Sequence, residues 1–351
     1  MNNSWRGGDE VLASVFSAKG SKVKETSSGY TIFGQTSVIG TKVGRKISMT
    51  GDCDLGAQQN SDPSTYFYYF DYNIYSGIKK MTSSTERLYS VVDPSNSTEV
   101  TTNYFYDNLN NDHQQLSRKV TSDSEGNSYQ TSYWYTADFD NTVWDVAELK
   151  DNHIIGIPIK EEYYKNNQLI AGKVSHLNEY GKPVEVYQLE TNVPKTPVIH
   201  NSVIPIPSGL SYIKKLDINY DAATHNIIEA SLTDNVNTVY LWGYDNTYPV
   251  AKIENSDSST VVSNLGITLS ALQNLDEQAL RDRLDILRHA LPYAMVTSYT
   301  YDPLYGKTSE TDPNGFTTYF YYDNLGRLTR IEDAKKNILK KLEYHYTTST
   351  N

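Results

Sequence analysis

Residues 299–323 read YTYDPLYGKTSETDPNGFTTYFYYD and contain one complete unit of a repeat. A strand-like run ends in the pair Tyr301-Asp302, and the next one ends in the pair Tyr322-Asp323. A glycine that can take the positive φ of a tight turn follows the first pair, and the turn sequence Asp-Pro-Asn-Gly follows the next strand. Strands of about five to seven residues between such turns predict successive antiparallel β-hairpins.

The Tyr-Asp pair recurs along the chain, each time at the end of a strand-like run. Its five copies are Tyr106-Asp107, Tyr220-Asp221, Tyr244-Asp245, Tyr301-Asp302 and Tyr322-Asp323. Internal repeats of this kind decide the architecture before any other signal. Tyrosine supplies 30 of the 351 residues, and its large ring with a polar tip suits strands. The spacing of the copies drifts, so the sequence predicts an all-β fold, an irregular stack of antiparallel Tyr-rich β-hairpins.

The run Asp323-Asn324-Leu325-Gly326-Arg327-Leu328 carries a family resemblance. It resembles the hallmark of the Rhs/YD-repeat family, a Tyr-Asp followed by a Gly-Arg turn and a second Asp/Asn/Gly turn. The resemblance is specific over residues 299–346 and weaker over residues 64–253. It is closest to the large YD-repeat surface proteins of Bacteroides-like bacteria. The family implies a YD-repeat sheet or partial shell, and in toxin-delivering relatives long arrays form a hollow β-shell around a toxic cargo.

The repeat-defining residues are expected to be structural. They are Tyr106, Asp107, Tyr220, Asp221, Tyr244, Asp245, Tyr301, Asp302, Gly306, Tyr322, Asp323, Gly326 and Arg327. Each aspartate is expected to cap the following turn by accepting backbone N–H hydrogen bonds. The alternative is ligand or calcium binding on a repeated face. The structural interpretation is favoured because every unit carries the pair, and because no turn has the spacing of oxygen ligands of a calcium loop.

The resemblance and the composition along the chain divide it into six parts. They are a Gly-rich β lead-in (1–60), degenerate YD-type hairpins (61–193), a Pro-rich loop or linker (194–210), further YD-type hairpins (211–255), a helical insertion (256–292), and well-matched repeats with a tail (293–351). The Pro-rich part is not expected to form a central strand, because proline lacks the N–H donor of a ladder. The lead-in is expected to hold short strands separated by glycines.

One amphipathic α-helix is predicted in the insertion, from an apolar stripe with helical spacing. The stripe consists of Leu280, Leu284, Leu287 and Leu291. Asn274 can cap the helix with Glu277 as its capping-box partner, Glu277 and Arg281 form an i, i+4 pair, and Pro292 ends it. The insertion is expected to cover an open edge or end of the sheet. A partner-binding helix is the alternative.

Charge and cysteine content exclude several classes of function. The formal net charge is −11 and the isoelectric point is near 5.1, with no basic stripe, so nucleic-acid binding is not expected. Cys53 is the single cysteine, and Asp52 and Asp54 beside it would raise its thiol pKa, so neither a disulfide framework nor a nucleophile is expected. No apolar run is long enough to cross a membrane, and no membrane insertion is expected.

No catalytic or metal-binding motif is present in the sequence. The seven histidines lack zinc-like spacing, and no nucleophile elbow, phosphate loop or dinucleotide fingerprint occurs. The sequence therefore predicts no enzyme, no metal and no cofactor. Exposed aromatic residues could stack on sugar rings, with Trp134, Trp242, Tyr319 and Tyr321 as the candidates. Cross-strand aromatic pairing within the sheet is the favoured interpretation.

These observations predict a non-catalytic structural or interaction region of an exported bacterial YD-repeat protein, located at the cell surface or outside the cell. The first ten residues lack a signal peptide, so the chain is expected to be the C-terminal portion of a longer exported protein. Expected partners are the upstream repeats of that protein, and surface glycans or another protein. Two alternatives stay open: a fragment of a toxin-delivery shell, and a carbohydrate-binding or carbohydrate-cleaving β-solenoid. The toxin alternative is weakened because no cargo domain or terminator motif follows Tyr346 here.

Overall fold

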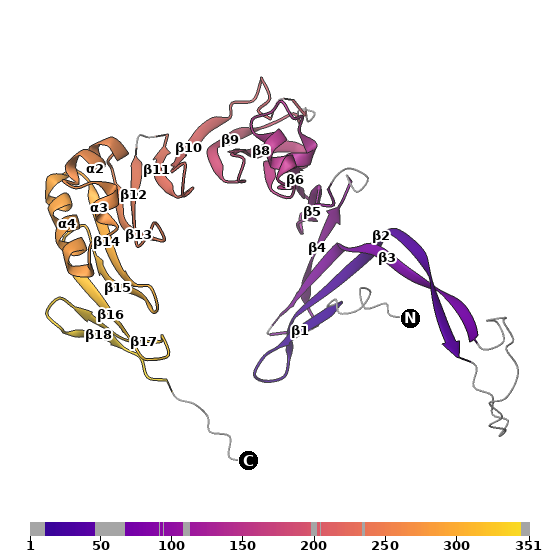
Figure 1. Ribbon diagram of the computed structural model, residues 1–351. Helices are drawn as coiled ribbons and strands as arrows, with labels where there is room; N and C mark the ends of the chain where they lie inside the picture. Colours follow the sequence, from indigo (N-terminus) through magenta and orange to yellow (C-terminus); the bar gives the residue numbers. More distant parts are fainter. Residues whose placement is uncertain are drawn as a thin grey trace, which may run out of the picture. The chain divides into compact units, whose positions relative to one another are not determined.

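The computed structural model describes residues 11–45, 67–90, 92–93, 95–107, 113–197, 202–203, 205–233 and 236–344 (Figure 1). The chain divides into two compact units. The first consists of Met1–Ala137, Glu161–Ile170 and Thr191–Ile199, and the second of Asp138–Lys160, Ala171–Glu190 and His200–Asn351. Cys53 and the first ten residues, on which sequence predictions were based, lie outside the described residues.

The first unit is built on antiparallel strands that follow one another in the chain. They are β1 (Leu12–Phe16), β2 (Lys22–Arg45), β3 (Phe67–Tyr89), β4 (Ser97–Phe105), β5 (Arg118–Ser122) and β6 (Ser128–Tyr135). Each strand from β1 to β6 pairs antiparallel with the next one. Three further strands contain residues of both units: β7 (Pro158–Lys165), β8 (Gln168–Leu177) and β9 (Pro183–Lys195).

The second unit continues the same pattern around a group of helices. Its strands are β10 (Ile213–Tyr220), β11 (Ile227–Leu232), β12 (Asn237–Gly243), β13 (Tyr248–Glu254), β14 (Met295–Asp302), β15 (Gly306–Thr311), β16 (Thr317–Tyr322), β17 (Leu328–Asp333) and β18 (Ile338–Lys341). Every consecutive pair from β9 to β18 is antiparallel. The predicted all-β stack of antiparallel hairpins is confirmed.

Aspartate and glycine set the turns between these strands. In the turn between β15 and β16, Asp312 Oδ1 accepts hydrogen bonds from the backbone N–H groups of Asn314 and Phe316, both at 2.9 Å. Gly315 in the same turn has a φ of 84°, which a residue with a Cβ atom adopts only with strain. The Asp-Pro-Asn-Gly sequence therefore fixes this hairpin locally, as its chemistry predicts.

A compact hydrophobic core lies where helices cover one face of β12, β13 and β14. The helices are α2 (Ser258–Asn264), α3 (Leu269–Leu272) and α4 (Glu277–Ala290), drawn in orange in Figure 1. The buried cluster contains Val239, Leu241, Val250, Ala251, Ile253, Val261, Leu265, Leu272, Leu280, Leu284, Leu287, Leu291 and Val296. The predicted leucine stripe thus faces strands that are themselves rich in branched apolar residues, which explains why α4 forms there.

The prediction of a single helix is wrong, because the described residues contain four α-helices. α1 (Val146–Asp151), α2 and α3 have six, seven and four residues, too short to produce an apolar periodicity that sequence reading can detect. The expected position over a sheet edge or end is also wrong, because the helical insertion covers a face of the sheet. Apolar residues on one face of a sheet must be buried by another element, just as an unpaired edge must be protected.

The N-cap of α4 also differs from the prediction. Asp276 caps the helix, since its side chain accepts a 2.8 Å hydrogen bond from the Ala279 N–H, whereas Asn274 donates to the Ser270 carbonyl. Aspartate suits this position because its negative charge also favours the positive end of the helix dipole. The predicted ion pair is present, with Arg281 Nη1 3.3 Å from Glu277 Oε2.

Four glycines of the lead-in lie within one long strand and do not separate short ones, so that expectation is wrong for the described part of the lead-in. β2 is one strand of 24 residues that contains Gly29, Gly34, Gly40 and Gly44. Aromatic side chains of β3 occupy the space above two of these glycines: a Cβ atom at Gly40 would lie 2.8 Å from Tyr72 Cζ, and one at Gly44 would lie 2.4 Å from Tyr68 Cζ. The cross-strand tyrosines replace the missing side chains, so the strand continues.

At the other predicted boundary, β9 extends to Lys195 and so includes Pro194, which the sequence analysis assigns to a loop or linker. Proline is tolerated here because the last residues of β9 are exposed. None of the helices among the described residues is long and apolar enough to cross a membrane.

The packing of α4 predicts a sharp difference between two of its apolar residues. Leu284 is fully buried in the core cluster, and Leu284→Ala is expected to destabilise the second unit by about 2–5 kcal/mol through lost contacts and a cavity. Ile286 on the same helix is 55% exposed, so Ile286→Ala is the matched control with little expected effect. Urea unfolding followed by helical circular dichroism measures both, and equal losses would contradict this packing.

Candidate functional site

In three of the five Tyr-Asp pairs, the strand that pairs with the tyrosine has a β-bulge. The strand register shifts between Asn219 and Tyr220, between Thr300 and Tyr301, and between Tyr321 and Tyr322. In each case the second strand of the hairpin carries one extra residue. These extra residues are Ile228, Thr308 and Thr329. A bulge disrupts the ladder locally, increases the twist and changes the direction of nearby side chains.

Each of these bulges lies beside a backbone carbonyl that accepts a hydrogen bond from an aromatic side chain later in the chain. Tyr322 Oη donates to the Lys307 carbonyl at 2.9 Å, next to the extra residue Thr308. At the other two bulges, the bound carbonyl likewise belongs to the residue just before the extra one. Tyr344 Oη donates to the Leu328 carbonyl at 2.9 Å, and Trp242 Nε1 donates to the Ile227 carbonyl at 2.8 Å. We call this arrangement of bulge, carbonyl and aromatic donor the aromatic latch.

Two further repeat tyrosines donate to carbonyls of earlier strands. Tyr220 Oη binds the Pro183 carbonyl of β9 at 2.9 Å, and Tyr106 Oη binds the Met81 carbonyl of β3 at 3.1 Å. Burial raises the pKa of both phenols above their ordinary value of 10.0, so the hydroxyls keep the proton that they donate. The repeat tyrosine therefore ties one hairpin to an earlier part of the array.

The pairs at Tyr244 and Tyr301 use a different contact. The Tyr301 backbone N–H donates to Tyr244 Oη at 2.8 Å, and the Tyr301 ring stacks on the Tyr248 ring with centroids 4.7 Å apart. Burial among these rings raises the pKa of Tyr301 to about 12. The helical insertion falls between these two pairs in the chain, and direct contact between their tyrosines keeps their strands joined across it.

The aspartate of the best-matched repeat holds its own turn. Asp323 Oδ1 accepts from the backbone N–H groups of Leu325 and Arg327 at 2.9 and 3.0 Å, and Oδ2 accepts from Arg327 Nε at 2.8 Å. The hydrogen bond from the Arg327 side chain, followed by the backbone bonds, lowers the pKa of the Asp323 carboxyl. The Arg327 guanidinium also lies 4.6 Å from the centre of the Tyr344 ring. Arg327 thus joins the turn to the donor of the next latch.

The other aspartates differ in their contacts. Asp221 accepts from the backbone N–H groups of Ala223 and Thr224 at 3.0 and 2.8 Å, and Asp302 accepts from the Leu304 N–H at 2.8 Å. Asp107 accepts instead from Ser117 Oγ and Arg118 Nε, at 2.9 and 3.0 Å. Asp245 has a φ of 54° in a run of three left-handed residues, and this turn is held by Gln273, whose Oε1 accepts from the Asn246 N–H at 3.2 Å.

The two repeat glycines serve the turns. Gly306 has a φ of 124° and Gly326 one of 76°, both in the region that favours glycine. A Cβ atom at Gly306 would lie in ordinary contact with Tyr322 Oη, at 3.4 Å, so the positive φ is the reason for glycine at this position.

The four aromatic residues proposed for ligand stacking do not form one platform. All four are half-buried, and they lie on β6, β12 and β16. Trp242 is a latch donor, the Tyr319 ring lies 5.8 Å from the Arg281 guanidinium, and the Tyr321 ring lies 4.1 Å from that of Arg330. Trp134 is engaged with neighbouring groups as well. Ligand stacking by these residues stays a prediction.

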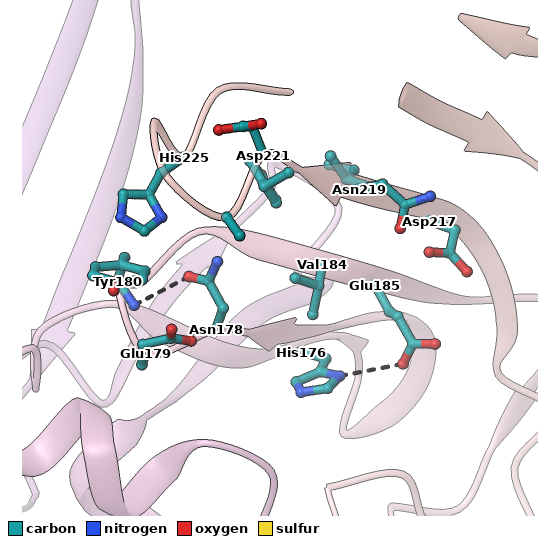
Figure 2. Close-up of a pocket in the computed structure, with 13 residues that line it drawn as sticks. His176, Asn178, Glu179, Tyr180, Val184, Glu185, Asp217, Asn219, Asp221 and His225 are labelled. Atoms are coloured by element: carbon teal, nitrogen blue, oxygen red, sulfur yellow. Dashed lines mark hydrogen bonds and ion pairs between the residues drawn. The ribbon is translucent and has the colours of Figure 1, made fainter. Parts of the chain in front are cut away.

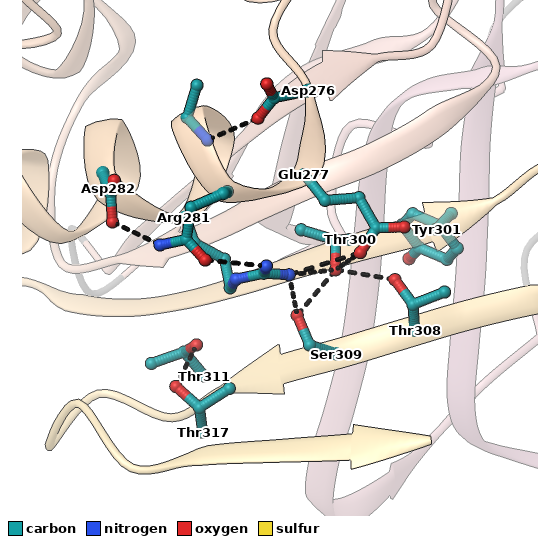
Figure 3. A network of polar contacts seen from close by, with 12 residues as sticks. Asp276, Glu277, Arg281, Asp282, Thr300, Tyr301, Thr308, Ser309, Thr311 and Thr317 are labelled. Atoms are coloured by element: carbon teal, nitrogen blue, oxygen red, sulfur yellow. Dashed lines mark hydrogen bonds and ion pairs between the residues drawn. The ribbon is translucent and has the colours of Figure 1, made fainter. Parts of the chain in front are cut away.

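Under the first turns of α4, the sheet face becomes polar (Figure 3). Arg281 Nη1 lies 3.3 Å from Thr300 Oγ1 and 3.4 Å from Ser309 Oγ, and these two hydroxyls lie 2.6 Å apart. Thr300 and Ser309 are both 1% exposed. The arginine satisfies buried hydroxyls of β14 and β15, so it extends the contact of the helix beyond the apolar core.

One pocket of the second unit lies between two turns and the strands beside them (Figure 2). Its volume is about 500 Å³. Three of the carboxylates that line it have partners: Glu185 and Asp217 bind Lys214 at 3.1 and 2.7 Å, and Asp221 caps its own turn. His176 Nδ1 lies 3.3 Å from Glu185. In the part of the chain that the structure describes, no three His, Cys, Asp or Glu side chains converge to hold a metal ion.

Comparison with known proteins identifies one repeat. The family model of the RHS repeat matches residues 305–338, which contain β15, β16 and β17, so the predicted resemblance is confirmed for this part of the chain. No curated protein matches the sequence. The structure is similar to the crystal structure of TcdB2-TccC3, with 9% identity and a TM-score of 0.41, over 90% of this chain and 16% of that one. For TcdB2-TccC3 without its hypervariable C-terminal region, the TM-score is 0.43, with the same identity and coverage. The chain thus spans 16% of the length of these solved chains.

The latch predicts a small, specific cost for losing one hydroxyl. Tyr322→Phe keeps the ring but leaves the Lys307 carbonyl without its donor, and is expected to destabilise the second unit by about 0.5–1.5 kcal/mol. Tyr305→Phe is the control, since its ring stacks on Tyr322 at 6.4 Å and its hydroxyl makes no latch contact. Urea unfolding compares the two variants, and an equal cost for both would contradict the latch.

The lowered pKa of Asp323 predicts a pH dependence with a definite sign. Its ordinary value is 3.8, and the folded state holds it lower, so the turn is stabilised in full above the unfolded value. That stabilisation is lost as the pH falls through the folded pKa. Amide exchange of residues 323–333 during acid titration measures it. Asp323→Asn should remove this component, and an unchanged acid profile in the variant would show that the carboxylate does not hold the turn.

Proposed function

We propose that this chain is a non-catalytic structural and interaction segment of an exported bacterial YD-repeat protein that is located at the cell surface. The observation that carries the proposal is the aromatic latch, which recurs at three hairpins and at one of them is donated by the repeat tyrosine Tyr322. Repeat side chains that could act in catalysis, such as Tyr322 and Asp323, instead make hydrogen bonds within turns and between hairpins. The RHS repeat at residues 305–338 supports the same interpretation.

The structural role follows from where each repeat group is engaged. Tyr322 donates to a carbonyl, Asp323 caps a turn, and Arg327 binds Asp323 and the ring of Tyr344. A nucleophile or general acid needs a side chain that is free to meet a substrate. Side chains whose donors and acceptors are already satisfied inside the sheet supply rigidity, which suits a scaffold that presents surfaces to partners.

The proposed location rests on the surface chemistry and on the family resemblance. The chain is acidic, with a net charge of −11, which favours solubility and disfavours binding to nucleic acid or anionic lipid. The repeat organisation suits one segment of a longer array. The chain also spans only 16% of the length of the solved chain that it matches. We propose further repeats of the same protein as the first partners of this segment. Its division at residues 60, 193, 210, 255 and 292 stays a prediction.

The test is to find the native protein in its organism. Cells are fractionated into envelope, medium and cytoplasm, and the intact mass and N-terminal sequence of the species that contains this chain are determined. The proposal predicts a species longer than 351 residues in the envelope or the medium. A free cytoplasmic protein that begins at Met1 would contradict export. A toxic domain released from the same species would favour a toxin-delivery shell instead.

A further inference from the structure

The outer half of the β2–β3 hairpin is a two-stranded ribbon without neighbours. Near its base, β1 pairs with β2 up to Ser27, and β4 pairs with β3 from Ser83 onward. Beyond those residues, β2 and β3 pair only with each other among the described residues of the first unit, as far as Arg45 and Phe67. An isolated two-stranded hairpin is marginally stable in water. Beyond Ser83, β4 no longer pairs with this edge, and in the described part of the first unit no other strand takes its place, although Tyr106 Oη still reaches the Met81 carbonyl.

This ribbon exposes apolar side chains on both faces. The exposed fractions are Val38 65%, Ile39 69%, Val43 63%, Tyr68 48%, Tyr69 74%, Phe70 47%, Tyr72 41% and Ile74 52%. Opposite residues of an antiparallel pair share a face, and the pairs Val38–Ile74 and Val43–Tyr69 lie on opposite faces of the ribbon. Contiguous exposed apolar surface of this kind marks an interaction site.

The outer edge of β3 has few of the features by which edge strands avoid pairing. Residues 67–78 read FYYFDYNIYSGI, with one charged residue and no proline. That charge belongs to Asp71, and only one of its carboxylate oxygens, Oδ1, accepts the 2.6 Å hydrogen bond from Thr41 Oγ1 of β2. Tyr68 and Tyr72 also lean over glycines of β2. Within the described residues of the first unit, no strand pairs with this edge between Phe67 and Ile78.

We propose that this edge of β3 pairs antiparallel with the same edge of a second copy of the chain, around a two-fold axis at Tyr72. The two hairpins then form one four-stranded sheet. In this register Tyr72 lies opposite Tyr72 of the second copy, Phe70 lies opposite Ile74, and Asp71 lies opposite Asn73. Apolar residues meet apolar residues on one face, and on the other the carboxylate meets an amide that can donate a hydrogen bond.

Neighbouring registers are less favourable for definite reasons. Opposite residues share a face, so a two-fold axis perpendicular to the sheet must pass through a residue position. An axis at Asp71 places two carboxylates opposite each other, which is destabilising. An axis at Phe70 places Asp71 opposite Tyr69, and an axis at Asn73 places it opposite Tyr75. Only the axis at Tyr72, among these, gives the carboxylate a donor.

A second copy fits this ribbon better than a lipid bilayer does. Inside a bilayer, the unpaired N–H and C=O groups of both edges would each cost several kcal/mol. Asp71, Asn73 and Thr41 would also enter the hydrocarbon. Pairing with another β3 edge satisfies the backbone groups and keeps polar side chains at the surface of a wider sheet.

Charge reversal at the two-fold axis tests the register directly. The full chain is measured by light scattering after gel filtration over a dilution series, as wild type, Tyr72→Lys, Tyr72→Asp and an equimolar mixture of the two variants. Each variant alone places like charges opposite each other and should weaken the dimer at least about tenfold. The mixture should restore association, because lysine then faces aspartate. Val43→Lys is the control on β2, away from the axis, and should leave the dimer intact.

A covalent probe keeps the test decisive if a charged variant folds poorly. In a Cys53→Ser background, Tyr72→Cys places two cysteines opposite each other, with Cα atoms about 4.5–5.5 Å apart, a separation that a disulfide can bridge. Mild oxidation should then give a covalent dimer, and Val43→Cys should not. A wild-type chain that stays monomeric, a Tyr72→Lys dimer as tight as wild type, or a monomer that binds vesicles of anionic phospholipid would overturn the proposal.

Discussion

The hydrogen bond from an aromatic side chain to the carbonyl beside a β-bulge is the constraint on which the repeat depends. A bulge disrupts the ladder, and a carbonyl beside it that loses its donor forgoes a hydrogen bond worth about 0.5–1.5 kcal/mol. In this protein an aromatic residue later in the chain supplies the donor, as Tyr322 does for the Lys307 carbonyl and Tyr344 for the Leu328 carbonyl. Each hairpin thus satisfies a polar group of the hairpin before it. This linkage between neighbours is what makes a stack of small hairpins cooperative.

The latch also explains the position of the other repeat residues. The bulge at Thr308 directly follows the turn at Gly306, whose positive φ favours glycine, and places the Lys307 carbonyl where Tyr322 binds it. Asp323 then fixes the turn that follows the donor, and Arg327 connects that turn to the next aromatic ring. A thin sheet with little volume between layers gains rigidity in this way from polar contacts. Where the second unit has a true apolar core, helices supply it from outside the repeat.

Local chemistry in the sequence predicted the hairpins, the turns and helix α4, because each depends on residues close together in the chain. The bulges were not predicted, since an extra residue in a strand leaves no local mark. Trp242 was considered as a ligand-stacking residue, yet it is a latch donor. Either a tyrosine hydroxyl or a tryptophan N–H can satisfy the carbonyl, so the contact does not require a Tyr-Asp pair. Because Trp242 is not part of such a pair, the sequence pattern did not reveal its contact. The sequence placed the cap of α4 at Asn274 rather than at Asp276 because the leucine stripe does not define the first turn of the helix.

The most direct test of the latch compares amide hydrogen exchange in the wild type with that in Tyr322→Phe and Trp242→Phe. Both variants keep an aromatic ring and lose only the donor. The account predicts that exchange rises around Thr308 in the first variant and around Ile228 in the second, with each bulge unaffected by the other substitution. Unchanged exchange at both bulges, or a uniform rise across the second unit in either variant, would contradict it.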